Sequence, residues 1–563
     1  MNLKQKDNID LLDMKDYLLP QNDGKRFSMP KIHRYISRNK GKVNFDIFDQ
    51  EALHNDEKTN ELIRTGNTIG CFYIESPGMR SLLKRLDCHT FEMLVAASSI
   101  IRPGVAESGM MQEFIERHRD PKKRKYLIPE IEVLLGETYG VMIYQEDVIK
   151  IVSEIGGLTL VEADLLRRAM SGKMRSHKAM QILIDKFFDS CRLKGYSEKI
   201  ILELWNQIES FAGYAFNKAH SASFAIVSYQ VAYLKMYFPD KFMASVLNNQ
   251  GGYYSAAVYI QESKRMGLEV LLPDINRSKY EYVGKNGILQ MGFLAIKNLT
   301  RDLSRKMVKE REYNGKYVSL IDFLIRIKPN VKEVELLIKC GAMDSLNLTR
   351  PTLMRMLDIY ILQRKIFDES YQDLFEFESY KLEIEIKTDY QYPISTICKI
   401  EYETFGFMVT RHPLEFFPQI INRKDIMKAT ELEKYNGKHI KIVGWFMASK
   451  RIKTKKGKIM KFLSLEDLTG TFEAVLFPNV YSRFAEKTLT MGPYLIEGKA
   501  DIENGINIIV ENLTILSAKE LNATTQKDSS ENKYYGDVEK IREEEFHIVA
   551  ALGKTNLELA YAS

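Results

Sequence analysis

The hydrophobic pattern of the chain changes once, and this change limits the folds that it can adopt. Between Phe91 and Asn249 apolar residues recur mainly at three- and four-residue steps, the period of α-helices. From Lys438 to Leu516 they follow the pattern of β-strands, in the segments HIKIVGWF, KIMKFLSLED, TFEAVLF, YLIEGKAD and INIIVENL. Five short strands with turns of Lys-Gly, Thr-Gly and Asn-Gly character favour a small barrel, with the OB-fold as the leading candidate. We therefore predict a multidomain α+β protein in which a mostly helical region precedes a small β-barrel.

Composition indicates a globular protein of several domains. The 563 residues predict about three to five domains, and 45% hydrophobic residues are ample for their cores. The five cysteines are widely scattered and never form a CxxC pair, which argues against a zinc ribbon or a disulfide framework. The N-terminus is too charged for a signal peptide, and no apolar run approaches the ~18 residues of a membrane span. We expect a cytoplasmic protein with no membrane partner.

The segment FAGYAFNKAHSASFAIVSYQVAYLK, residues 211–235, is predicted to form a helix after Gly213. Its apolar stripe consists of Phe224, Val227, Val231 and Leu234. Its cations and hydroxyls are expected to share one exposed face, formed by Lys218, Ser221, Ser228 and Lys235. With His220 near the helix start, where unpaired backbone N–H groups point the same way, this face suits a phosphate. An ordinary amphipathic helix is the alternative, and periodicity alone favours it.

Two other segments concentrate positive charge, although the net charge of the chain is only +6. Between Leu166 and Lys178 there is no acid, and the cations are Arg167, Arg168, Lys173, Arg175 and Lys178. The segment SKRIKTKKGKIMK, between the first two predicted strands, carries Lys450, Arg451, Lys453, Lys455, Lys456, Lys458 and Lys461. A basic loop flanked by Trp445, Phe446 and Phe462 suits single-stranded nucleic acid, because bases stack on rings while cations follow the phosphates. A solvated charged loop is an equal alternative for the first segment, and a place in the barrel core is the favoured role for Trp445.

Residues 287–346, from GILQMGFLAIKNLT to LLIKCGAMDSL, are predicted to contain a helix-hairpin-helix unit. Such hairpins hold the DNA backbone through the N–H groups of their turns. The usual glycine pair of the turn is replaced by Asn298, Leu299 and Thr300, so a purely structural turn is an equal alternative.

Ten motifs, in order, resemble the C-family bacterial DNA polymerases, the alpha subunit of DNA polymerase III. They are TGNTIGCFYIESPGM, IIRPGVAESGMM, ETYGVMIYQEDV, ADLLRRAMSGK, FAGYAFNKAHSASFAIVSYQVAYLK, LLPDINRS, GFLAIK, LIKCGAMDSL, ETFGFMVTRHPLEFFP and SLEDLTGTFEAVLFP. The resemblance runs from Glu61 to Leu516, and its RPGVAESGMM and RRAMSGK are nearer to the accessory, error-prone branch than to the main replicative enzyme.

The resemblance implies six parts. Residues 1–60 would be the end of the palm, 61–285 the fingers that bind nucleotide and template, and 286–350 the helix-hairpin-helix region. Residues 351–430 would be a helical connector, 431–517 the OB-fold and 518–563 a polar tail. The nucleotide-binding residues would be Arg102, Arg167, Arg168, Lys173, Asn217, Lys218 and His220. The DNA-binding residues follow instead from the basic loop described above, and they are Lys450, Arg451, Lys453, Lys455, Lys456 and Lys458.

The family also implies two Mg²⁺ ions, held by palm carboxylates that activate the primer hydroxyl and stabilise the leaving pyrophosphate. Here the sequence departs from the family. The D-x-D pair of the palm is not found, and NIDLLDMK offers only Asp10 as a catalytic and metal-binding residue, with Asp13 where glycine is expected. The N-terminal phosphoesterase-like domain is also missing, and Tyr73 stands where the family often has glutamine.

Three functions are compatible with these features. The first is the nucleotide- and DNA-binding portion of a DNA-directed DNA polymerase, acting on primer-template DNA, single-stranded DNA and deoxynucleoside triphosphates. An upstream palm-bearing polypeptide and a sliding clamp would be its further partners. The second is a non-catalytic DNA-binding scaffold or polymerase remnant, inactive alone. The third, a nuclease or ligase, ranks last because neither a nucleophilic lysine motif nor a metal cluster is seen in the sequence.

Overall fold

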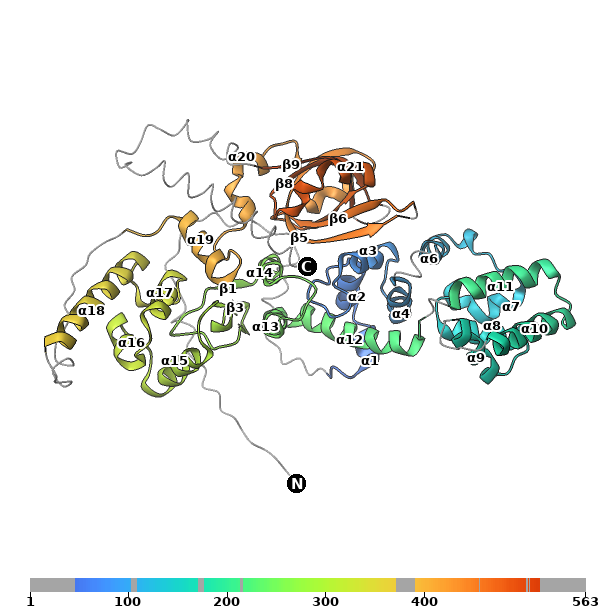
Figure 1. Ribbon diagram of the computed structural model, residues 1–563, viewed down its shortest axis with the longest axis horizontal. Coiled ribbons are helices and arrows are strands. Elements are labelled where there is room, and N and C mark those ends of the chain that lie inside the picture. The colour runs from blue at the N-terminus through green and yellow to red at the C-terminus, as the bar shows by residue number, and fades with distance from the viewer. Residues whose placement is uncertain are drawn as a thin grey trace, which may run out of the picture.

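The computed structural model describes residues 46–102, 109–170, 177–212, 216–370, 390–454, 456–502, 505 and 507–516. Figure 1 shows an elongated molecule in which helices α6–α11 form one end, α15–α18 form the other, and a β-barrel lies over the middle. The predicted residues Asp10, Lys173 and Lys455 and the polar tail lie outside the described residues.

Thirteen labelled helices precede the first strand in the part of the chain that the structure describes. They are α1 (Gln50–His54), α2 (Glu57–Arg64), α3 (Pro77–Arg85), α4 (Phe91–Ile100), α6 (Met110–Arg119), α7 (Pro129–Leu135), α8 (Gln145–Glu154), α9 (Leu160–Met170), α10 (His177–Leu193), α11 (Glu198–Ala212), α12 (Lys218–Tyr237), α13 (Pro239–Asn249) and α14 (Ala256–Arg265). The first four begin at residues whose side chains accept a backbone N–H of the first turn: Asp49, Asp56, Ser76 and Thr90. The apolar and aromatic residues from Cys71 to Ile74 predict a short strand, and this prediction is wrong, because Gly70 and Tyr73 take positive φ angles of 83° and 70° and fold the segment into turns.

Helix α12 is central to the helical region, and three of the four residues of its predicted polar face are buried rather than exposed; the exception is Lys218, whose side chain is 41% exposed. Ser221 and Ser228 are fully buried, whereas Val227 of the expected apolar stripe is 39% exposed. The Ser221 hydroxyl lies 2.7 Å from that of Ser99 on α4, and the Ser228 hydroxyl donates to the Phe72 carbonyl. Small hydroxyl-bearing side chains let neighbouring backbone approach α12 while their polar atoms stay hydrogen-bonded.

A chain of buried ion pairs joins α12 to the barrel. The Lys235 ammonium donates to the carbonyls of Asn67 and Ile69 and lies 2.7 Å from Glu262 of α14. Glu262 also pairs with Arg265 at 3.2 Å, and Arg265 reaches Glu466 of the barrel at 2.7 Å. Burial disfavours the charged form of Glu262, but Lys235 and Arg265 outweigh it and lower the pKa of this carboxyl to about 2. The expected exposed position of Lys235 is therefore wrong, because the ammonium has three partner atoms in the interior.

The helix-hairpin-helix region follows a small sheet of order β1-β3-β2, with β1 (Glu269–Leu271), β2 (Val283–Lys285) and β3 (Ile288–Gln290). Its helices are α15 (Arg301–Asn314), α16 (Leu320–Ile327), α17 (Val331–Lys339) and α18 (Arg350–Ser370). In the turn before α15, Asn298 takes the left-handed conformation with φ 64°, which glycine would otherwise supply. Thr300 caps α15 and donates its hydroxyl to Glu333 of α17 at 2.8 Å. The turn's hydroxyl is thus used inside the protein.

The barrel follows α19 (Ile394–Phe405), α20 (Pro418–Ile421) and β4 (Ile426–Met427). Its strands are β5 (His439–Lys453), β6 (Ile459–Glu466), β7 (Thr471–Leu476), β8 (Tyr494–Asp501) and β9 (Asn507–Ile515), with α21 (Pro478–Phe484) between β7 and β8. The order β5-β6-β7-β9-β8 closes through a β5–β8 pairing, and β7 and β9 are parallel. This closed five-stranded barrel confirms the predicted OB-like fold. Trp445 is buried as expected, but it packs against Cys398, Leu414 and Phe417 and so fastens the connector to the barrel.

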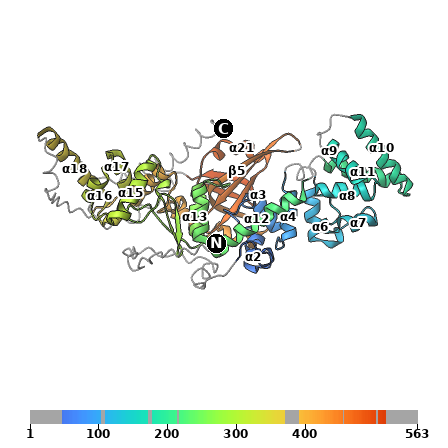
Figure 2. The same ribbon diagram turned by 90° about the horizontal axis from the view of Figure 1, so that it is seen from below.

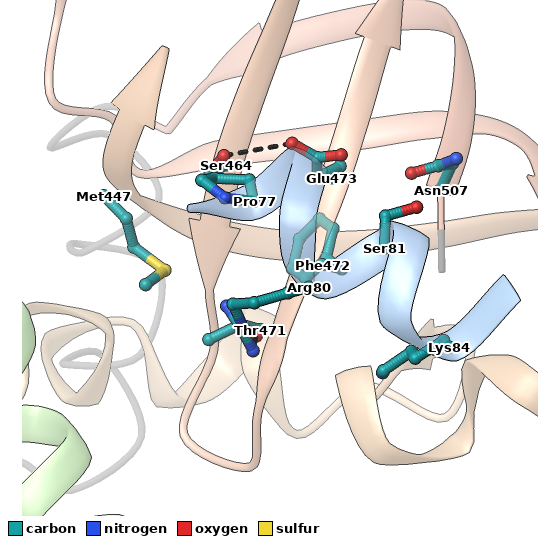
Figure 3. Close-up of a pocket in the computed structure, with 10 residues that line it drawn as sticks. All are labelled: Pro77, Arg80, Ser81, Lys84, Met447, Ser464, Thr471, Phe472, Glu473 and Asn507. Carbon is teal, nitrogen blue, oxygen red and sulfur yellow. Dashed lines mark hydrogen bonds between the residues drawn. The ribbon is translucent and has the colours of Figure 1, made fainter. Parts of the chain in front are cut away.

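The barrel also meets the helical region along α3 (Figure 3). The Arg80 guanidinium donates to the Gly66 carbonyl at 2.8 Å and to the Thr471 hydroxyl of β7 at 2.8 Å. Beside it lies a cavity of about 40 Å³, lined on the barrel side by residues that include Ser464 and Glu473. The contact between the two regions thus combines these hydrogen bonds and the buried ion pairs with apolar packing, in which Met447 of β5 joins the core of the helical region.

Replacing Glu262 by glutamine should destabilise the fold strongly. The change leaves two buried cations without their shared anion, and breaking such a network costs about 3–5 kcal/mol. We expect a clear fall in the midpoint of thermal unfolding. The matched control is Glu61→Gln, which removes an exposed pair with Arg64 and should cost no more than about 1 kcal/mol. Equal effects of the two changes would contradict a structural role for the buried network.

Candidate nucleotide and DNA interface

Four of the predicted site residues gather around the start of α12. Asn217 caps the helix, and its side-chain oxygen accepts the His220 N–H at 2.8 Å. Lys218 is the first helical residue. The His220 ring lies edge-on to Phe216 at 5.0 Å between centroids, and the Arg102 guanidinium lies over the same Phe216 ring at 3.5 Å. Arg102, Asn217, Lys218 and His220 therefore form one cluster, although Arg102 is more than 100 positions away from the others.

Sequence reasoning missed the aromatic residues that hold this cluster together. The Phe224 ring stacks with Tyr73 at 4.9 Å and meets His220 edge-on at 4.4 Å. The Tyr73 hydroxyl accepts a hydrogen bond from Arg102 at 2.8 Å, and Arg102 in turn contacts the Phe216 ring, so the contacts form a closed ring of side chains. The four-residue spacing of Phe216, His220 and Phe224 is a signal that could have predicted part of it. Tyr73 gave no such signal, because its position depends on a turn that the sequence did not predict.

Two carboxylates occupy the cationic part of the same cluster. The Lys218 ammonium contacts both oxygens of Glu137, at 2.7 and 2.9 Å. Glu146 accepts the Lys218 backbone N–H at 3.0 Å and the Asn217 side-chain amide at 2.7 Å. An anion is thus already bound at the α12 N-terminus, where an N–H group and a lysine converge. A phosphate at this place would have to displace these carboxylates.

The predicted arginines of α9 are held differently. Arg167 and Arg168 both reach Asp164, each with a shortest distance of 2.7 Å. Hydrogen bonding from Arg167 lowers the pKa of this carboxyl. The Arg167 side chain is only 11% exposed, whereas that of Arg168 is 58% exposed. Of the two, Arg168 is therefore the more exposed at the surface.

The predicted basic loop is a two-stranded ribbon made by the ends of β5 and β6, which pair from Trp445 to Lys453. Lys450, Arg451 and Lys453 lie on β5, and Lys456 and Lys458 lie in the turn; all five are exposed. Figures 1 and 2 show this ribbon reaching out from the barrel on the side of α4 and α6. Lys461 is an exception, because its ammonium is buried and donates to the Thr488 carbonyl and hydroxyl. Burial lowers the pKa of Lys461 to about 8.

The described residues contain no group of three or more histidine, cysteine or acidic side chains placed to hold a metal ion. They therefore do not fit the pair of Mg²⁺ ions that the resemblance implies. Within the same ranges, no helix has both the length and the apolar character needed to cross a membrane.

Comparison with known proteins agrees with this architecture. Residues 28–195 match the finger domain of the bacterial DNA polymerase III alpha subunit, and residues 267–353 match a helix-hairpin-helix motif. A DNA polymerase III subunit alpha of Staphylococcus epidermidis is 33% identical over 495 residues, which are 87% of this chain and 45% of the relative. A subunit alpha of Staphylococcus aureus is 33% identical over 474 residues, or 84% of this chain and 44% of that protein. The chain thus spans a little under half the length of these relatives.

Finger helices, a helix-hairpin-helix region and an OB-like barrel in this order define the C-terminal portion of a C-family polymerase alpha subunit. The chain belongs to the family of bacterial DNA polymerase III alpha subunits.

Asp147, at the start of α8 beside Glu146, should make the stability of the fold depend on pH. Its buried carboxylate accepts the N–H groups of Ile143 and Tyr144, and burial raises its pKa from 3.8 to about 7. Because the folded state binds this proton more tightly than the unfolded state, stability falls as pH rises from about 4 to 7. Asp147→Asn keeps an acceptor oxygen and should flatten this slope. The free energy of unfolding should then lose on the order of 2–4 kcal/mol less between pH 4 and pH 7 than in the wild type.

The measurement is the thermal midpoint between pH 4 and pH 8, with the exposed Asp185→Asn as control. A slope that survives in Asp147→Asn would assign the pH dependence to another group.

Proposed function

We propose that this chain supplies the fingers and DNA-binding domains of a DNA-directed DNA polymerase, which carries out template-directed nucleotidyl transfer in replication or repair synthesis. The observation that carries the proposal is the cluster at the start of α12, where Arg102, Asn217, Lys218 and His220 converge beside stacked rings. A cytoplasmic location is part of this proposal.

The cluster has the chemistry that a deoxynucleoside triphosphate requires. Lys218 and Arg102 supply positive charge, and the first N–H groups of α12 point in the direction from which an anion would approach. Glu137 and Glu146 now neutralise part of this charge. A triphosphate carries more charge than a single carboxylate and can displace them, so binding exchanges one set of anions for another. Arg168, which is exposed on α9, would contact the template strand.

The ribbon and the helix-hairpin-helix region would hold DNA outside this cluster. Lys450, Arg451, Lys453, Lys456 and Lys458 are exposed along one projection, which suits the backbone of a single strand. The hairpins would contact primer-template DNA through backbone groups, without reading sequence.

Catalysis requires carboxylates that the described residues do not bring together, and Asp10 lies outside those residues. We therefore assign the two Mg²⁺ ions to a complete palm, to which an upstream palm-bearing polypeptide would contribute; a sliding clamp is a further partner of the whole enzyme. A non-catalytic DNA-binding scaffold is the alternative.

Primer extension tests the proposal directly. The chain alone, with Mg²⁺ and all four nucleotides, should bind primer-template DNA without extending it, because one palm carboxylate cannot place two metal ions. Addition of a polypeptide that carries the family's palm should restore extension. Extension by the chain alone would contradict the need for a second polypeptide. If the mixture binds DNA but does not extend the primer, the result would favour the non-catalytic scaffold.

Replacing Lys453, Lys456 and Lys458 by alanine should weaken single-strand binding and reduce its salt dependence. Three lost phosphate contacts lower the slope of log K against log salt by about two, since each contributes about 0.7 for a single strand. The measurement is oligothymidylate affinity at four or five salt concentrations. The matched control replaces Lys434, Lys438 and Lys499, which are exposed near the other end of β5, and it should leave the slope unchanged. A slope equal to that of the wild type would remove the ribbon from the DNA path.

A further inference from the structure

The backbone of Tyr73 is held in a conformation that tyrosine rarely adopts. Its φ of 70° lies in the left-handed region, where the side chain crowds its own backbone. Two hydrogen bonds fix the neighbouring carbonyls: Ser228 donates to the Phe72 carbonyl at 3.1 Å, and Thr68 donates to the Ile74 carbonyl at 2.6 Å. Such strain persists only where the surroundings over-determine the backbone, and it is concentrated at functional sites.

A third anchor is the buried carboxylate of Glu75. It accepts the backbone N–H groups of Gly70 and Tyr253 and the Tyr259 hydroxyl, at 2.8, 2.5 and 2.9 Å. The turn from Thr68 to Glu75 is thereby tied to α12 and α14 and to the segment between α13 and α14. The direction of the Tyr73 side chain is consequently set by the core rather than by solvent.

The side chain that this turn directs ends on a cation. The Tyr73 hydroxyl accepts a hydrogen bond from the outer nitrogen of Arg102 at 2.8 Å, while its ring stacks on Phe224 with an interplanar angle of 23°. The Arg102 guanidinium also lies over the Phe216 ring, 3.5 Å from the centroid of that ring. Arg102 is thus fixed in plane by a ring and along one edge by a hydroxyl.

We infer that Tyr73 is a positioning residue for nucleotide binding, which it serves by holding the Arg102 guanidinium in the orientation that meets the phosphates. This inference rests on the proposed function and extends it to a residue outside the predicted site. A free arginine side chain loses rotamer freedom when it binds an anion, and orienting it beforehand removes part of that cost. A guanidinium has five N–H groups, and Tyr73 uses one edge while others remain to face a ligand.

The test compares Tyr73→Phe, Arg102→Lys and the double variant. Phenylalanine keeps the ring, the stacking and the backbone conformation and removes only the hydroxyl. The control is Tyr237→Phe, which removes a hydroxyl that donates to Asp56 at 2.6 Å near the far end of α12. Affinities for dATP and for deoxyadenosine are measured by equilibrium titration of the whole chain.

Tyr73→Phe should weaken dATP binding about five- to tenfold, because a hydrogen bond to a charged group is lost. It should leave deoxyadenosine binding unchanged, since that ligand has no phosphate. The double variant should bind dATP no more weakly than Arg102→Lys, because Tyr73 acts through Arg102. The Tyr237→Phe control should match the wild type for both ligands.

Three results would overturn the inference while leaving the proposed function standing. They are an equal loss of affinity for dATP and deoxyadenosine in Tyr73→Phe, additive losses of dATP affinity in the double variant, and an unchanged dATP affinity in Tyr73→Phe. Failure of the wild-type chain to bind dATP would instead contradict the proposed nucleotide site, and the inference with it.

Discussion

The buried chain of charges from Lys235 through Glu262 and Arg265 to Glu466 is the interaction on which the arrangement of the whole molecule depends. It links α12, α14 and the barrel strand β6, which are distant in sequence. A hydrophobic contact would stabilise the same approach over a range of angles. Fixed ion pairs tolerate few geometries, because any displacement leaves a charge without a partner in the interior. The network therefore specifies where the barrel sits relative to the fingers.

The same use of polar groups in the interior explains what the sequence could predict and what it could not. The five barrel strands and the helical fingers followed from periodicity, and the structure confirms them. Periodicity misassigned α12, because Ser221, Ser228 and Lys235 look like surface residues until their partners are known. Those partners lie on α4, in the turn after α2 and on α14, and no local sequence pattern predicts them. Hydrogen-bonded burial is a property of the assembled fold.

The candidate site shows the same division. Lys218 and His220 were accessible to sequence reasoning because they adjoin a predicted helix start, and the resemblance supplied Asn217 and Arg102. The structure shows that Arg102 meets the other three through Phe216, and it adds Glu137 and Glu146 as competing anions. The cations of the β5–β6 segment were visible from composition, yet their division into exposed residues and the buried Lys461 depends on strand pairing. Charge can be read from a sequence, whereas its availability cannot.

Helix α12 has its first turn in the cluster formed with Arg102 and its last turn in the buried ion network. Its 20 residues span about 30 Å, so it acts as a rigid rod between the two places. Glu146 contacts the first turn of this helix, and Lys235 near its other end pairs with Glu262 in the ion network that reaches the barrel. The cluster at the helix start and the contact that positions the barrel are thus joined by a single helix.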